Sequence, residues 1–171
     1  MPSDRQSGFT LIELMVTIAV LAVLLGLALP SFQGSLRSNR VATATNDMLA
    51  SLALARSEAI RSTRGGGVCA SNDGATCGGT WGDGWLVWAD ANGSGTLDGG
   101  ETVLRYSRGN PSLAATGPNG SPVAFDARGR RRAGGDQTLT LKPSECGGQP
   151  LQRTLTINAT GQVRTAKGSC S

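Results

Sequence analysis

The N-terminal part of the chain is dominated by one apolar run. Residues 1–8 are polar, and the 21 residues from Phe9 to Leu29 form a largely apolar stretch with a single charge, Glu13. A membrane-spanning helix needs about 20 such residues. A secretory signal peptide is the alternative, but it requires small residues at a cleavage site after the run, and here Pro30-Ser31-Phe32 follows. The pattern therefore predicts a transmembrane helix over residues 9–30.

After Pro30 the pattern changes from continuously apolar to amphipathic. Six apolar residues recur at a spacing of three or four, while charged residues occupy other faces. These six are Val41, Ala44, Met48, Leu52, Ala55 and Ala59. Because this stripe continues beyond Pro30, we expect the proline to kink the helix rather than to end it. Gly65-Gly66-Gly67 predicts the end of the helix. One helix over about residues 9–64 would be roughly 80 Å long, with an amphipathic second half at 31–64.

The remaining residues, 65–171, contain short β-type segments separated by glycine-rich turns. Six segments show period-2 alternation or many β-branched residues. They are residues 85–88, 102–106, 122–125, 138–141, 154–157 and 162–164. Helices and strands do not alternate along the chain, so we expect antiparallel strands. The pattern predicts an α+β protein whose long N-terminal helix packs its apolar stripe on an antiparallel β-sheet domain.

The composition excludes most kinds of catalytic site. The sequence contains no histidine, which removes histidine-based general acid-base catalysis, Ser-His-Asp and Cys-His arrangements and most catalytic zinc sites. No nucleophile motif is present. We therefore expect a protein that is not an enzyme and that has no cofactor.

The four cysteines point to disulfides if the protein is exported. Cys69 and Cys77 are close in sequence, whereas Cys146 and Cys170 bracket the C-terminal stretch. Three connectivities are formally possible. The expected one joins Cys69 to Cys77 and Cys146 to Cys170.

The N-terminal motif resembles the type III signal of type IV prepilins. In Gly8-Phe9-Thr10-Leu11-Ile12-Glu13-Leu14, a polar leader ends in Gly8, Phe9 follows, and an acid is the fifth residue after the glycine. The resemblance implies that a prepilin peptidase removes residues 1–8 and methylates the new amino group of Phe9. It also implies that Pro30 is the kinking proline of many pilins. A charge-assisted pair between Glu13 and such an amine, its own or a neighbour's, would offset the cost of a carboxylate in lipid.

The later sequence resembles the GspH/FimT family of minor pilins and pseudopilins. The resemblance rests on the order of several loose matches. These are Gly84-Trp85-Leu86-Val87-Trp88, Asp90-Ala91-Asn92-Gly93, Gly99-Gly100-Glu101-Thr102-Val103-Leu104-Arg105, Phe125-Asp126-Ala127-Arg128-Gly129 and Gly161-Gln162-Val163-Arg164. It implies an assembly subunit in the bacterial inner membrane, with residues 65–171 in the periplasm and with other minor and major pilins or pseudopilins as partners. A minor pilin that initiates or tips a type IV pilus is expected first, and the H-like pseudopilin of a type II secretion system is the alternative.

The segment from Asp90 to Glu101 fits a twelve-residue calcium loop. It has oxygen-bearing residues at positions 1, 3, 5 and 9, glycine at position 6 and glutamate at position 12. Its flanks, however, are typical of strands rather than of helices, and Asn-Gly and Gly-Gly pairs form tight turns without metal. We expect a hairpin connection without a metal ion, with calcium as the alternative.

Charge is distributed unevenly along the chain. Residues 65–104 hold five acids and no base, whereas residues 105–171 hold ten bases and three acids. The candidates for contacts with DNA phosphates are Arg128, Arg130, Arg131, Arg132, Arg164 and Lys167. Some members of the resembled family with a Gly-Arg-x-Arg signature are linked to DNA uptake, but Gln162 replaces its first arginine here. A DNA-binding minor pilin is thus an alternative, and a solvated surface or a contact with an acidic pilin neighbour is expected instead.

Overall fold

The computed structural model describes residues 8–170, except for the side chains of residues 27–31. The chain divides into two compact units, Met1–Leu36 and Arg37–Ser171. Helix α1, Leu11–Ser62, contributes to both units. Within the described part of the chain, no helix contains an apolar stretch long enough to cross a membrane.

Both ends of α1 have local causes. At the start, Thr10 Oγ1 accepts the backbone N–H of Glu13 at 3.3 Å, which satisfies one of the unpaired donors of the first turn. At the end, Thr63 adopts a φ of 55°, the left-handed conformation that terminates many helices. The single long helix predicted from the sequence is therefore confirmed. The helix continues through position 30, but the side chain of Pro30 lies outside the described residues, so the kink stays a prediction.

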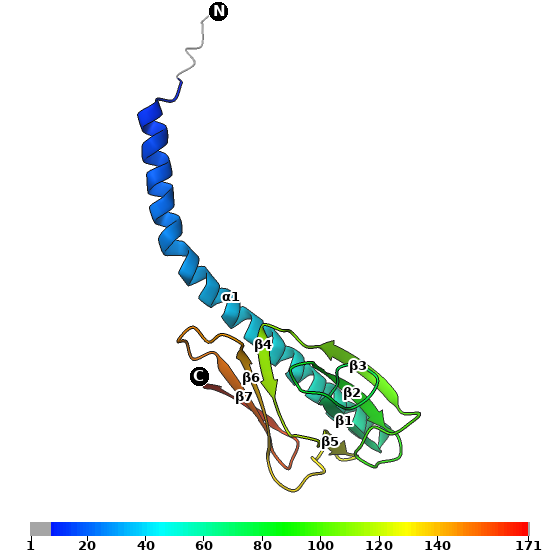
Figure 1. Ribbon diagram of the computed structural model, residues 1–171. Coiled ribbons are helices and arrows are strands. Elements are labelled where there is room, and N and C mark those ends of the chain that lie inside the picture. Colours follow the sequence, from blue (N-terminus) through cyan, green and yellow to red (C-terminus); the bar gives the residue numbers. More distant parts are fainter. Residues whose placement is uncertain (1–7, 171) are drawn as a thin grey trace, which may run out of the picture. The chain divides into compact units, whose positions relative to one another are not determined.

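Among the described residues, eight strands follow the helix and form two four-stranded antiparallel sheets, which lie beside each other in Figure 1. Sheet A has the order β3-β2-β1-β5 and sheet B the order β4-β6-β7-β8, with all neighbours antiparallel. The strands of sheet A are β1 Gly65–Ala70, β2 Gly84–Asp90, β3 Thr102–Arg108 and β5 Val123–Asp126. Those of sheet B are β4 Leu113–Thr116, β6 Gln137–Pro143, β7 Gln152–Ile157 and β8 Val163–Gly168.

Two of these strands, β1 and β4, were not predicted from the sequence. The three glycines that were predicted to end the helix instead form the first half of β1, which is an inner strand of sheet A. A Cβ at Gly66 would collide with the backbone carbonyl of Ala55 on α1, and a Cβ at Gly67 would overlap the ring of Trp88 on β2. Glycine is needed here because the strand lies against the helix on one face and against an indole on the other.

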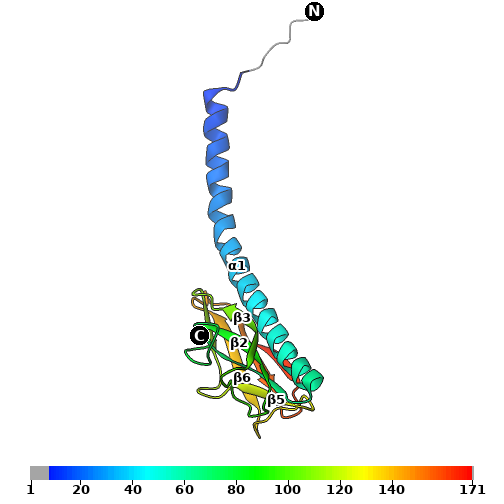
Figure 2. The ribbon, with the colours of Figure 1, turned by 90° about the vertical axis from the view of Figure 1, so that its right-hand side faces the viewer.

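The second half of α1 lies along the sheets (Figure 2), and one apolar core joins it to both of them. Five residues of the predicted stripe are fully buried, and Ala44 is half-buried. The buried five are Val41, Met48, Leu52, Ala55 and Ala59. The sheets contribute Val68, Trp85, Val87, Val123 and Phe125 from sheet A, and Leu139, Leu141, Leu155 and Ile157 from sheet B. Ser51 Oγ accepts the indole N–H of Trp85 at 3.0 Å, so the polar group of this buried ring is satisfied within the core.

A second, smaller cluster covers the opposite face of sheet A. Leu86 and Trp88 of β2 pack there with Cys69, and Leu97, Val103 and Tyr106 lie against them. Leu97 belongs to the loop from Asp90 to Glu101, so that loop shields the outer face of the sheet. Sheet A thus buries apolar area on both faces, and the burial of Leu97 holds the loop from Asp90 to Glu101 against its outer face.

Candidate functional site: assembly surfaces on the helix and sheets

The first candidate surface is the N-terminal half of α1. The large apolar side chains of this half, together with Phe9 just before the helix, are between 49% and 84% exposed. They are Phe9, Leu11, Ile12, Leu14, Met15, Val16, Ile18, Val20, Leu21, Val23, Leu24 and Leu25. A continuous apolar surface of this length marks a contact with lipid or with another protein. We therefore expect lipid or the apolar surface of another protein to cover this half of the helix.

Glu13 stands in the first turn of this exposed helix. A carboxylate near a helix N-terminus is stabilised by the partial positive charge of the free N–H groups. Among residues 8–170, Glu13 forms no ion pair. Gly8 lies just before the helix, and a Cβ added there would meet no atom within 4 Å within the described chain. The side chain of Phe9, 84% exposed, is equally accessible.

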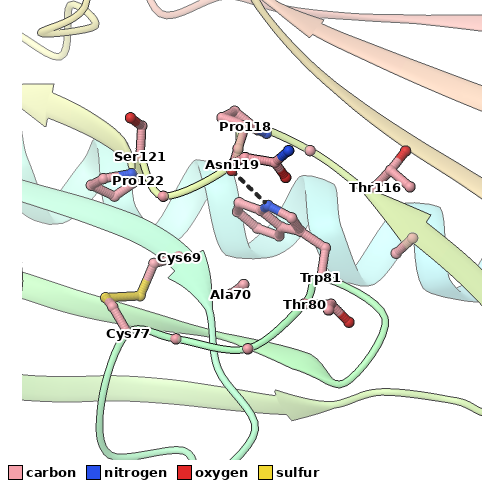
Figure 3. A pocket seen from close by; sticks show the side chains of 15 residues that line it. Cys69, Ala70, Cys77, Thr80, Trp81, Thr116, Pro118, Asn119, Ser121 and Pro122 are labelled. Carbon is pink, nitrogen blue, oxygen red and sulfur yellow. Dashed lines mark hydrogen bonds between the residues drawn. A yellow bond between two sulfur atoms is a disulfide. The ribbon is translucent and has the colours of Figure 1, made fainter.

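Both expected disulfides are present. Cys69 is bonded to Cys77, and Cys146 is bonded to Cys170. The first disulfide borders a cavity of about 310 Å³ together with the loop that joins β4 to β5 (Figure 3). Trp81 fills much of the space between them, and its indole N–H donates to the carbonyl of Pro118 at 3.2 Å. Trp81 is only 4% exposed. Its ring therefore packs between the Cys69–Cys77 loop and the loop that joins β4 to β5, and it is not available to stack on a ligand.

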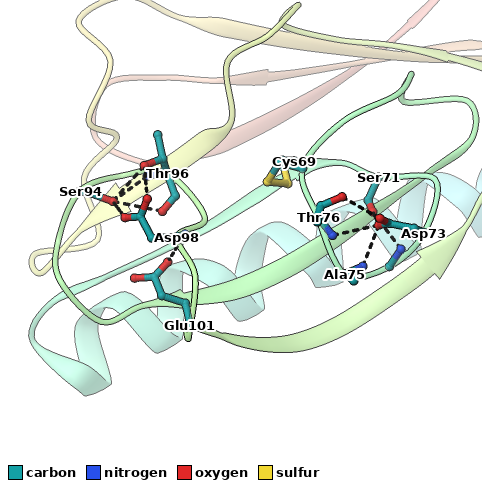
Figure 4. The surroundings of a disulfide bond; sticks show 11 residues. Cys69, Ser71, Asp73, Ala75, Thr76, Ser94, Thr96, Asp98 and Glu101 are labelled. Atoms are coloured by element: carbon teal, nitrogen blue, oxygen red, sulfur yellow. Dashed lines mark hydrogen bonds between the residues drawn. A yellow bond between two sulfur atoms is a disulfide. The ribbon is translucent and has the colours of Figure 1, made fainter.

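The loop from Asp90 to Glu101 uses its own donors to satisfy its carboxylates. Asp90 is 1% exposed and accepts the N–H groups of Ser94 at 3.0 Å and Gly95 at 2.8 Å. Glu101 accepts the N–H group of Ala91 at 2.8 Å and that of Asp98 at 3.0 Å, and the second of these hydrogen bonds is drawn in Figure 4. The side chains of Asn92 and Ser94 donate to Asp98 and hold the pKa of that carboxyl below its usual range. The loop is therefore held by hydrogen bonds.

This hydrogen bonding bears on the calcium alternative. Calcium requires six to eight oxygens directed at one centre. In this loop the oxygens instead accept N–H and O–H groups, and Arg132 lies 3.9 Å from Asp90. Within residues 8–170 no group of three or more His, Cys, Asp or Glu side chains could hold a metal ion.

A second carboxylate-centred turn lies inside the Cys69–Cys77 loop. Asp73 accepts hydrogen bonds from the hydroxyl and the N–H of Thr76, from the N–H of Ala75 and from the hydroxyl of Ser71, at 2.7–3.0 Å (Figure 4). These donors, those of Thr76 first, hold the pKa of Asp73 far below its usual range. The ionised side chain organises the turn.

The six basic candidates do not form one exposed cluster, and this corrects the sequence interpretation. Arg131 is only 5% exposed; its Nη2 donates to the carbonyl of Ala133 at 3.1 Å, and burial lowers its pKa. Arg132 turns towards Asp90. Arg131 forms an isolated antiparallel bridge with Phe125 of β5, so the backbone is extended here. In an extended backbone the side chains of successive residues point to opposite sides, which separates Arg131 from Arg130 and Arg132. Arg128, Arg130 and Arg132 are exposed in this segment, and Arg164 and Lys167 are exposed on β8.

Sequence reasoning missed the residue that connects these turns to the helix. Arg56 donates from Nε to the carbonyl of Gly129 at 2.9 Å and from Nη2 to that of Thr160 at 3.3 Å. One guanidinium thus ties the turn before β6 and the turn before β8 to α1. A lone arginine on an amphipathic helix gives no sequence signal for this role, because both acceptors are backbone carbonyls more than 70 residues away.

The long helix with an exposed apolar half, packed by its second half on antiparallel sheets, defines a pilin-like subunit. Two family models match the chain: type II transport protein GspH over residues 44–161 and the prokaryotic N-terminal methylation motif over residues 3–29. The chain belongs to the GspH family.

Individual relatives agree with this family. The pilin-like protein PilA1 of Thermus thermophilus is 29% identical over 161 residues, which cover 92% of this chain and 89% of that protein. The prepilin peptidase-dependent protein D of Escherichia coli is 48% identical over 46 residues, or 27% of this chain and 29% of that protein.

Two solved structures share the fold. The type IV minor pilin FimU of Pseudomonas aeruginosa has a TM-score of 0.56 and 24% identity over 75% of this chain and 89% of its own. The minor pseudopilin EpsH of the Vibrio cholerae type 2 secretion system has a TM-score of 0.52 and 17% identity over 74% of this chain and 96% of its own. The predicted pilin-like fold is confirmed.

Proposed function

We propose that this chain is a minor pilin that initiates or tips a type IV pilus. The observation that carries the proposal is the exposed apolar half of α1, which lies within residues 3–29, the part of the chain that matches the methylation-motif family model. In this proposal residues 1–8 are a leader, residues 9–30 anchor the protein in the inner membrane, and residues 65–171 lie in the periplasm. The subunit works by assembly and not by catalysis. Prepilin peptidase processes it, and other pilins bind it.

Glu13 and Phe9 have distinct roles in this proposal. Cleavage after Gly8 creates a positive amine at Phe9, and the carboxylate of Glu13 pairs with that amine or with the amine of a neighbouring subunit. A paired charge costs much less in an apolar environment than a single one. The pairing therefore favours one relative position of neighbouring helices along the axis of the fibre. Pro30 would allow the helix to bend between its apolar N-terminal half and its amphipathic second half.

Mass spectrometry of the membrane-bound protein tests the maturation step. We expect a mature N-terminus at Phe9 carrying one methyl group. Gly8→Ala should leave the precursor uncut, because the peptidase approaches a residue without a Cβ at that position. Gly26→Ala is the matched control, since a Cβ there meets no described atom within 4 Å, and it should be processed normally. A mature N-terminus beyond Leu29, with release of soluble protein, would overturn the proposal.

The machine in which the subunit works is tested by gene deletion. A minor pilin should be needed for surface pili, and it should be found in the sheared pilus fraction. Loss of protein secretion with normal piliation would instead favour the type II secretion alternative, which the description of the matching family model supports.

A further inference from the structure

Sheet B ends at β8 beside the outer face of α1. Among the described residues, no strand pairs with the second edge of β8. A groove of about 510 Å³ lies between the helix and the start of β8. Its walls are Leu49, Leu52, Ala53, Arg56, Ser57 and Ile60 of α1 with Gly161 and Val163. Ile60 is 49% exposed, so apolar surface is left uncovered where a further strand of the sheet would pack.

The backbone of β8 has hydrogen-bonding groups to offer at this edge. Asn158 donates its N–H to the carbonyl of Gln162 at 3.0 Å, which makes these two residues a hydrogen-bonded pair of the antiparallel ladder. Hydrogen-bonded and non-hydrogen-bonded pairs alternate along such a ladder. Val163, Thr165 and Lys167 therefore direct their N–H and C=O groups away from β7. These are the groups that an added strand would use.

The borders of the groove are basic. Arg56 lines it, and no acidic residue does. A Cβ at Gly129 would lie 2.7 Å from Cδ1 of Ile60, so the turn that carries the exposed Arg128 and Arg130 touches one end. On β8, Lys167 lies on the same face as Val163, which lines the groove, whereas Arg164 lies on the opposite face. The charge selects an acidic occupant.

We propose that β8 and this groove bind an extended acidic segment of a neighbouring pilin subunit, which adds to sheet B as a further strand. Alternate side chains of that strand enter the groove against Leu49 and Ile60, and its carboxylates face the bordering arginines. The inference rests on the proposed function. The apolar walls favour a protein segment over DNA, whose phosphates would contact the arginines but leave the groove unfilled.

Photo-cross-linking in the producing cells tests this contact with the full-length chain. A benzoylphenylalanine at position 60 should form a covalent adduct with another pilin. Mass spectrometry would identify the cross-linked partner as a pilin by the N-terminal methylation motif in the partner's sequence. The same probe at Thr138, on an exposed part of β6, should give no such adduct.

Thr165→Pro removes one of the outward N–H groups without touching the hydrogen bonds to β7. Proline is tolerated on an edge strand where its nitrogen faces solvent. We expect the adduct from position 60 to fall roughly tenfold, as for the loss of a backbone hydrogen bond across an interface. Thr165→Val, which keeps the N–H and the β-branched shape, should retain it.

A second pair of variants tests the groove independently of strand folding. Ala53→Phe fills the groove from an exposed helix position and should abolish the adduct, whereas Ala50→Phe, equally exposed on α1 but outside the groove, should not. An unchanged adduct yield in both Thr165→Pro and Ala53→Phe would overturn the proposal. So would an adduct with DNA alone.

The same probe at Val16 separates this inference from the proposed function. Adducts with other pilins from position 16 but none from position 60 would overturn the groove contact and leave the minor pilin assignment standing. No pilin adduct from either position would overturn both.

Discussion

Replacing Gly67 with alanine tests the packing that holds sheet A against its outer cluster. The new Cβ would overlap three atoms of the Trp88 ring, which is fully buried and has no room to move aside. Overpacking of this kind costs about 1–3 kcal/mol, and a rigid, fully buried ring places this site near the upper end. Alanine also lowers the conformational entropy of the unfolded chain, which stabilises the folded state by about 0.4–1 kcal/mol and offsets part of this cost. The free energy of unfolding should therefore fall by about 2 kcal/mol.

The assay is thermal and chemical denaturation of Arg37–Ser171, the unit that contains both apolar clusters. For a unit of this size 2 kcal/mol corresponds to a decrease in Tm of about 6 °C. Gly134→Ala is the control, because its Cβ would meet no described atom within 4 Å, and it should change Tm slightly or raise it. If Gly67→Ala were as stable as Gly134→Ala, the close approach of β1 to Trp88 would be refuted.

Two further predictions concern the acidic turns. Asp73→Asn should lower Tm at pH 7, because the ionised carboxylate is stabilised by its hydrogen bonds in the folded state only. The pKa of Asp73 is lower in the folded state than in the unfolded state, where it is about 4. The stabilisation is therefore complete above about pH 4 and is lost as the pH falls towards the folded-state pKa. A difference in Tm between mutant and wild type that stays constant from about pH 7 to pH 2 would contradict the reasoning. Millimolar calcium should leave the Tm of Arg37–Ser171 unchanged, since the carboxylates of the loop already accept hydrogen bonds; a rise in Tm that Asp90→Ala removes would favour the calcium loop.

The sequence determined the features that depend on local pattern. The apolar run and the motif at Gly8 and Phe9 are contiguous, and the stripe from Val41 to Ala59 follows helical spacing, so both are visible without tertiary structure. Six of the eight strands show alternation or β-branched residues, and the spacing of the cysteines favoured the disulfides that are present.

Only the tertiary structure decided features that depend on pairing between distant segments. Sequence shows that strands exist but not which of them pair, so the division into two sheets and the open edge of β8 were not predictable. Gly65-Gly66-Gly67 has the local signature of a helix end, while its role as a strand depends on Ala55 and Trp88 lying close on either side. In the same way, Arg131 belongs to a basic run in sequence, yet the bridge to Phe125 buries it, because alternation along an extended backbone overrides the charge of a single side chain.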